Sequence, residues 1–140
     1  MSDKATDQMT QADQERLILD AVERFLDKEV KPIAHDLERQ DAYPHDLIEK
    51  MKNLGLFGAT IGEPYGGLGL PAGTYARIVE RVAAVWMSVC GIFNSHLIMG
   101  AAVERFGSEE MKDNFLPAMA AGELRGGIAL TEPDCGTDLQ

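Results

Sequence analysis

The sequence predicts an all-α fold, a helical bundle of about five to six helices that ends in the beginning of a β-strand. Apolar residues recur at intervals of three and four through most of the chain, the spacing that gathers side chains on one face of a helix. Residues that favour helix starts and stops separate these periodic stretches. The apolar run 127–130 is short and is followed by a turn, which favours a strand.

The first helix is predicted to begin after Thr10, because this residue and Asp13 have the spacing of a capping box. Pro32 is expected to kink this helix, since proline lacks an N–H group and crowds the carbonyl four residues earlier. The apolar face consists of Leu17, Ala21, Phe25, Leu26, Val30 and Ile33.

The middle of the chain is predicted to hold two helical regions joined by a loop. Pro44 suits a first helical turn, and Gly55 suits the position after a last turn. The glycine-rich stretch 56–73 is interpreted as an irregular loop within one domain. From about Thr74 a helix is expected to run into an apolar stretch and to break near Trp86.

The apolar stretch 82–103 is long enough to cross a bilayer, but a buried core helix is the favoured interpretation. Polar side chains in lipid are costly without partners, and four interrupt the stretch: Ser88, Asn94, Ser95 and His96. Gly107 is expected to end this helical region, and Ser108 to cap another helix.

The composition is that of an ordinary folded protein, with 45% hydrophobic and 26% charged residues among 140. The formal net charge of -10 disfavours nucleic acid and anionic membranes as partners, because both attract clustered lysine and arginine. Cys90 and Cys135 lack zinc-site spacing and are expected to be free thiols in a reducing compartment. Residues 1–13 contain no apolar signal segment, so we expect a cytoplasmic protein.

The C-terminal residues 129–140 place threonines and acidic residues on a turn that Pro133 and Gly136 force. Hydroxyl and backbone N–H groups after a strand suit the polar edge of a flat cofactor or a phosphate. An ordinary surface turn explains the same residues, and their chemistry alone leaves both interpretations open.

Four stretches form an ordered set of motifs between about Leu17 and the end of the chain. They are 64–69 (Pro-Tyr-Gly-Gly-Leu-Gly), 106–112 (Phe-Gly-Ser-Glu-Glu-Met-Lys), 116–123, and 129–138 (Ala-Leu-Thr-Glu-Pro-Asp-Cys-Gly-Thr-Asp). Together these motifs resemble those of the acyl-CoA dehydrogenases, and the last resembles the flavin-site signature of that family.

The resemblance implies an FAD-dependent flavoprotein oxidoreductase of fatty acid metabolism. Such an enzyme removes a proton from the carbon α to an acyl-CoA thioester and passes a hydride from the β carbon to FAD. It also implies a polar tail at 1–12, an N-terminal helical domain at 13–126 and the start of a truncated middle β domain at 127–140. The chain is then expected to be the N-terminal part of a longer enzyme.

Carried over to this sequence, the signature implies that Ile128, Leu130 and Thr131 lie against the flavin ring. Gly136 would let the backbone approach closely, and Thr137 would reach the pyrophosphate of FAD or the coenzyme A arm of the substrate. Two positions depart from the family pattern. Thr137 stands where serine is more common, and Ile128 stands where many members have an aromatic residue.

The resemblance also implies that part of the long apolar stretch forms the wall of an acyl pocket. Four residues share one helical face there: Cys90, Gly91, Asn94 and Ile98. Gly91 would deepen the pocket, whereas Asn94 would add a polar group to it. The alternative is that these residues pack in the core, with Asn94 hydrogen-bonded to backbone.

No catalytic or metal-binding residue is nominated. The family's carboxylate base comes from a second helical domain, and nothing in this sequence matches it, so the chain is expected to be inactive alone. Glu132, Asp134 and Asp138 lack the spacing of a calcium loop. His96 is expected to be a hydrogen-bonded core histidine.

The resemblance implies acyl-CoA as substrate, an electron-transfer flavoprotein as electron acceptor, and a homo-oligomer when the enzyme is complete. The alternative is a non-catalytic helical interaction module that completes a site with a separate partner chain. A stable heteromer with that partner would distinguish the two.

Overall fold

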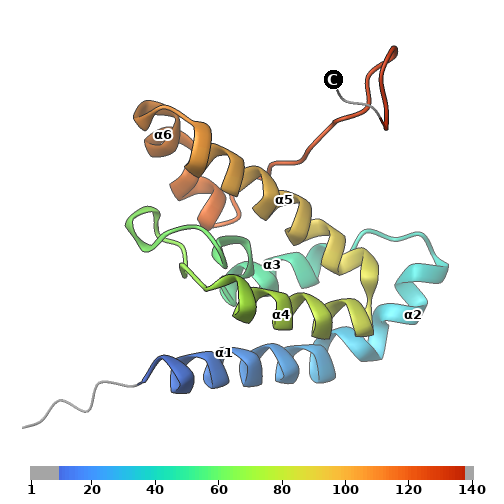
Figure 1. Ribbon diagram of the computed structural model, residues 1–140. Coiled ribbons are helices and arrows are strands. Elements are labelled where there is room, and N and C mark those ends of the chain that lie inside the picture. The colour runs from blue at the N-terminus through green and yellow to red at the C-terminus, as the bar shows by residue number, and fades with distance from the viewer. Residues whose placement is uncertain (1–9, 138–140) are drawn as a thin grey trace, which may run out of the picture.

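The computed structural model describes residues 10–137, and it confirms the all-α prediction (Figure 1). The described chain contains six α-helices, which are α1 (Gln11–Phe25), α2 (Lys31–Arg39), α3 (His45–Asn53), α4 (Ala72–Val85), α5 (Met87–Phe106) and α6 (Glu109–Ala120). Residues 1–9 of the predicted polar tail lie outside the described residues, as do Asp138 and the two residues after it, whereas residues 11 and 12 belong to α1.

The capping box predicted at the start of α1 is present. The hydroxyl oxygen of Thr10 accepts a hydrogen bond from the backbone N–H of Asp13 at 3.2 Å and donates one to the Asp13 carboxylate at 2.6 Å. The hydroxyl bond lowers the pKa of the Asp13 carboxyl group. Because the first N–H groups of a helix lack partners within the helix, this exchange stabilises its first turn.

The kink predicted at Pro32 takes the form of one wide turn between two helices. Residues Leu26–Val30 form a π-helical turn, in which the N–H of Lys31 bonds to the carbonyl of Leu26 five residues earlier. Pro32 then lies in the first turn of α2, where its missing N–H costs no hydrogen bond. The wide turn therefore accommodates a proline that a continuous α-helix would not.

The glycine-rich loop folds back on itself and packs into the core. Gly55 ends α3 with a φ of 72°, as its position predicted. Two short 3-10 turns follow, at Leu56–Gly58 and Glu63–Tyr65, and α4 begins at Ala72, two residues before the predicted start. Within the loop, the N–H of Leu68 bonds to the carbonyl of Gly58 at 2.8 Å.

Helix α5 packs against both α4 and α6 and is central to the core. Trp86 has extended backbone angles (φ -156°, ψ 105°), so α4 and α5 are separate helices, as predicted. Phe93 and Leu97 of α5 are buried, which confirms the prediction of a core helix. Among the described residues, no helix is long and apolar enough to span a membrane.

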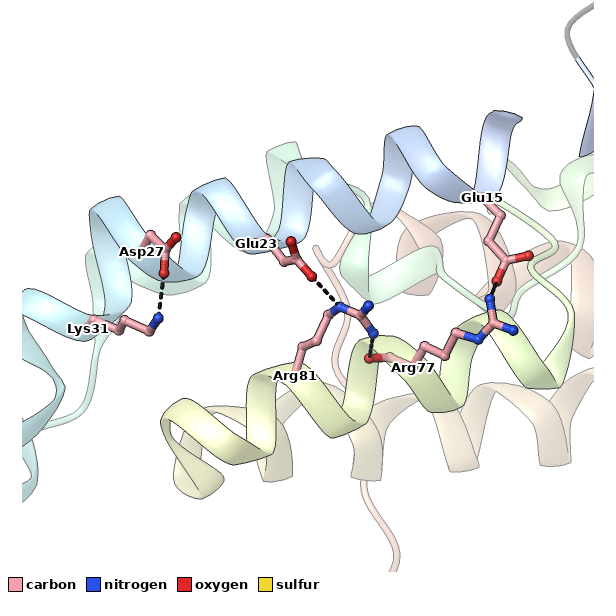
Figure 2. A network of polar contacts seen from close by, with 6 residues as sticks. All are labelled: Glu15, Glu23, Asp27, Lys31, Arg77 and Arg81. Atoms are coloured by element: carbon pink, nitrogen blue, oxygen red, sulfur yellow. Dashed lines mark hydrogen bonds and ion pairs between the residues drawn. The ribbon is translucent and has the colours of Figure 1, made fainter. Parts of the chain in front are cut away.

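Charged residues on the facing sides of α1 and α4 link the two helices (Figure 2). Arg77 pairs with Glu15, and Arg81 pairs with Glu23 at 2.7 Å. The Arg81 guanidinium also donates to the backbone carbonyl of Arg77 at 3.1 Å. Because these side chains are 25–58% exposed and solvent screens the charges, each pair contributes at most about 1 kcal/mol to stability. Apolar packing therefore dominates this helix contact.

Candidate functional site

The chain that follows α6 crosses α5 and then leaves the bundle (Figure 1). It first turns at Gly122, which has a φ of 72°. The backbone N–H of Gly126 then donates to Nδ1 of His96 on α5, at 3.2 Å. A side chain on Gly126 would not fit, because its Cβ would lie 2.7 Å from Cγ of Met99. Gly126 is therefore the point at which the segment touches α5.

The strand predicted at 127–130 is not formed. Residues 127–131 have no regular secondary structure, and in the described chain the neighbouring pairing is a single bridge between Glu132 and Cys135. A strand exists only when its backbone groups bond to a neighbouring strand. The apolar run 127–130 favours an extended backbone, but it does not provide the neighbouring strand.

The turn predicted at Pro133 is present. The N–H of Glu132 bonds to the carbonyl of Cys135 at 2.8 Å, and the reverse bond measures 3.3 Å. A Cβ on Gly136 would lie 3.8 Å from the nearest atom, a methyl carbon of Thr131, which is ordinary contact. Within this chain, Gly136 is therefore not required for packing.

The five residues that the signature assigns to the flavin lie on the surface. Ile128 is 41% exposed and Leu130 60% exposed. Thr131 and Thr137 are also exposed, and Gly136 is half-buried. None of the five belongs to the buried core, so their hydroxyl groups, backbone and apolar surface are accessible to a ligand.

The four residues assigned to the acyl pocket run from the core to the surface of α5. Cys90 is buried, and burial raises the pKa of its thiol. Asn94 is half-buried, whereas Gly91 is exposed and Ile98 is 48% exposed. A Cβ on Gly91 would meet no atom within 4 Å, so the glycine leaves open space beside the helix.

Asn94 is held by a side chain of the neighbouring helix rather than by backbone. The hydroxyl group of Tyr75 on α4 donates to Oδ1 of Asn94 at 2.6 Å. Burial, together with the nearby Cys90, raises the pKa of Tyr75 to about 12, so its hydroxyl remains a donor at neutral pH. The hydrogen bond found for Asn94 therefore comes from a side chain, and not from backbone as the core-packing alternative expected.

His96 links three parts of the chain and confirms the prediction of a hydrogen-bonded core histidine. Its ring is 0% exposed. Nε2 lies 3.0 Å from the carbonyl oxygen of Phe57 and 3.1 Å from that of Met119, while Nδ1 meets Gly126. Burial lowers the pKa of the imidazole.

Two of these residues, Tyr75 and Gly126, were not identified as site residues from the sequence. Their partners lie on other elements, and no periodicity relates positions 75 and 94 or 96 and 126. The structure connects the pocket face of α5 to the flavin segment through His96.

A cavity of about 600 Å³ lies elsewhere, between α1 and the loop before α4, and it is lined by none of the predicted site residues.

Comparison with known proteins identifies the family. The model of the acyl-CoA dehydrogenase N-terminal domain matches residues 12–123. The chain belongs to the acyl-CoA dehydrogenase family. It is 36% identical over 118 residues to an acyl-CoA dehydrogenase of Bacillus subtilis, covering 84% of this chain and 31% of the relative.

Two solved acyl-CoA dehydrogenases have the same fold. Butyryl-CoA dehydrogenase from Megasphaera elsdenii has a TM-score of 0.81 and 28% identity, covering 99% of this chain and 36% of that one. Glutaryl-CoA dehydrogenase from Mycobacterium smegmatis, in complex with FADH2, has a TM-score of 0.78 and 30% identity, covering 96% and 35%. The chain therefore spans about a third of the length of these relatives.

Among residues 10–137, no group of three or more potential metal ligands is present.

Proposed function

We propose that this domain forms part of an FAD-dependent acyl-CoA dehydrogenase, to which it contributes one wall of the acyl pocket and part of the flavin site. The observation that carries this proposal is the exposed backbone at 127–131, next to the signature turn. Its N–H groups have no partner within the described part of the chain. Family membership supports the proposal, and so does the FADH2 bound by the glutaryl-CoA dehydrogenase that shares the fold.

The residues present fit an isoalloxazine ring. The Thr131 hydroxyl and the neighbouring N–H groups are free donors for its polar edge, and Ile128 and Leu130 supply apolar surface for its face. When bound, FAD supplies the acceptor for the hydride that leaves the β carbon of the substrate. The donors of this segment would stabilise the negative charge that develops on the ring, because hydrogen-bond donors held at its polar edge favour the reduced, more negative state.

On α5, the space beside Gly91 and the exposed side chain of Ile98 suit an acyl chain. Asn94, oriented by Tyr75, would present its amide group to that pocket. No residue of this chain is proposed as the base that removes the α proton, so we propose that the chain alone does not turn over. An electron-transfer flavoprotein as acceptor, a homo-oligomeric complete enzyme and a cytoplasmic location belong to the same proposal.

We expect saturable binding of FAD to the purified chain, measured by quenching of flavin fluorescence. Replacing Thr131 with alanine should weaken this binding up to about tenfold, the effect of losing one hydrogen bond. Thr60→Ala, in the loop before α4, is the matched control and should leave the affinity unchanged. Equal affinity of the wild type and Thr131→Ala would contradict the role of Thr131. Absence of binding would mean that the flavin site needs further domains.

Gly91→Leu is expected to shorten the preferred acyl chain of the complete dehydrogenase, because a leucine would occupy the open space beside α5. The measurement is kcat/KM against straight-chain acyl-CoA thioesters of increasing length. Gly73→Leu is the matched control, since Gly73 lies on α4 and a Cβ there also meets no atom within 4 Å. An unchanged chain-length profile in Gly91→Leu would rule out Gly91 as part of the pocket wall.

A further inference from the structure

We propose that His96 is a positioning residue that holds the flavin-site segment 126–131 against α5 while its ring is neutral, and releases the segment when the ring is protonated. The consequence for flavin binding rests on the function proposed above, whereas the release itself does not. The release of the segment can therefore be measured on this chain without any cofactor.

The partners of His96 determine which nitrogen carries the proton. Nε2 faces two backbone carbonyl oxygens, from Phe57 and Met119, and a carbonyl oxygen can only accept a hydrogen bond. Nε2 must therefore be the protonated nitrogen of the neutral ring. The lone pair is then on Nδ1, where it accepts the N–H of Gly126. The three bonds are compatible with the neutral imidazole and with one tautomer only.

The bond to Gly126 is the main backbone attachment of the flavin-site segment. The preceding backbone bond joins Leu124 to Ala118, and the next one closes the turn at Glu132. Between them, the described backbone makes no other hydrogen bond than that of Gly126 to His96. The side chain of Arg125 also contacts the Tyr43 hydroxyl, but on the exposed surface. The direction in which the segment leaves α5 therefore depends on Nδ1.

Protonation would convert Nδ1 from an acceptor to a donor, so that two N–H groups would face each other. The carbonyl oxygens of Phe57 and Met119 favour the charged ring, but burial outweighs them and the net shift lowers the pKa of the imidazole. The 3-10 turn Leu56–Gly58 and the last turn of α6 (116–120) contain no titratable residue, and α5 places Asn94 and Ser95 beside His96. The segment 121–126 contributes Arg125, whose positive charge also lowers the pKa of the imidazole, and the exposed Glu123. Lys52 of α3, a second cation, reaches Gly122.

The sign of the pH effect follows from the lowered pKa. The pKa of the imidazole is lower in the folded chain than its ordinary value of 6.5. Above pH 6.5 the ring is therefore neutral and its three hydrogen bonds are complete. They are lost as the pH falls through the lower pKa of the folded state. Acid therefore releases the segment, and alkali does not.

The first experiment follows the Gly126 amide and the His96 ring carbons by NMR during an acid titration of the 15N- and 13C-labelled chain. We expect the Gly126 amide resonance to move with the same midpoint as the His96 ring, below the ordinary imidazole value. A titration of His96 that leaves the Gly126 amide unchanged would overturn the proposal.

Two variants separate the bonds of His96 at neutral pH. The amide of His96→Gln can reach the position of Nε2 and donate to a carbonyl, but it leaves no acceptor for Gly126. The amide of His96→Asn can reach the position of Nδ1 and accept from Gly126, but it does not titrate. Trypsin reports the difference, because the bond after Arg125 lies at the attachment point.

We expect trypsin to cleave after Arg125 about tenfold faster in His96→Gln than in the wild type, the change for one lost hydrogen bond. His96→Asn should be cleaved at nearly the wild-type rate and should show no acid-dependent shift of Gly126. Cleavage after Arg105, at the end of α5, is the internal control for general unfolding. Equal rates in all three proteins, or equal acceleration in both variants, would overturn the positioning role.

FAD titration of His96→Gln then tests the functional link. Weaker binding than in the wild type would support the positioning of the flavin site by His96. Unchanged FAD affinity with a released segment would contradict the link to the flavin site, while the proton-controlled attachment would stand.

Discussion

Replacing Gly67 with alanine is expected to destabilise the chain by about 3 kcal/mol or more, at the upper end of the cost of overpacking a core. A Cβ at this position would lie 2.0 Å from the carbonyl oxygen of Ile61 and 2.8 Å from that of Gly58. Both atoms are backbone and accept hydrogen bonds from Gly69 and Leu68, so neither can move without breaking the loop. Urea denaturation followed by circular dichroism measures the loss.

The neighbouring glycine provides the matched control. Gly66 has a φ of 83°, but a Cβ on it would meet no atom within 4 Å. Gly66→Ala should therefore cost only the strain of a left-handed backbone, about 1–2 kcal/mol. If Gly66→Ala were as destabilising as Gly67→Ala, the close approach of the two backbone segments would not be the cause.

Helix ends could be predicted from the sequence because local chemistry determines them. Thr10 and Ser108 cap their helices through hydroxyl groups that accept from the N–H three residues later. Gly55 ends α3 because it adopts a positive φ easily. In each case the partner atom lies within a few residues, so spacing along the chain suffices.

The form of the break before Pro32 could not be predicted as well as its position. Proline forbids a regular helix there, but several backbone geometries satisfy that condition. The π turn at Leu26–Val30 also buries Leu26 and Val30 against the rest of the molecule. That choice depends on packing across the fold, which the local sequence does not specify.

The candidate site shows the same division between local and distant causes. The residues of the signature turn and of the α5 face could be selected from the sequence and from its resemblance to a family. The contacts that orient them, Tyr75 to Asn94 and His96 to Gly126, join positions 19 and 30 residues apart. No strand forms at 127–130 in the described chain for a related reason, since an apolar run does not by itself provide a pairing partner.

A large loss from side-chain truncation is expected at Phe93, whose replacement by alanine should cost about 3–5 kcal/mol. Its ring is 0% exposed in the middle of α5, and the ring of Tyr75 meets it edge-on with the centroids 6.3 Å apart. The loss would combine the apolar surface no longer buried with the cavity left behind. Because the total stability of a domain is typically about 5–15 kcal/mol, a large part of it would disappear.

Phe106→Ala separates this packing effect from the effect of the substitution itself. Phe106 is the last residue of the same helix and is 79% exposed, with the Arg105 guanidinium 5.4 Å from the ring centroid. Its loss should cost less than about 1 kcal/mol. The midpoints of urea denaturation of the two variants give the difference in their free energies of unfolding, provided that both free energies depend equally on urea concentration. Similar losses in both would mean that the face of α5 bearing Phe93 is not the core, and that Tyr75 and Asn94 are not held against a rigid helix.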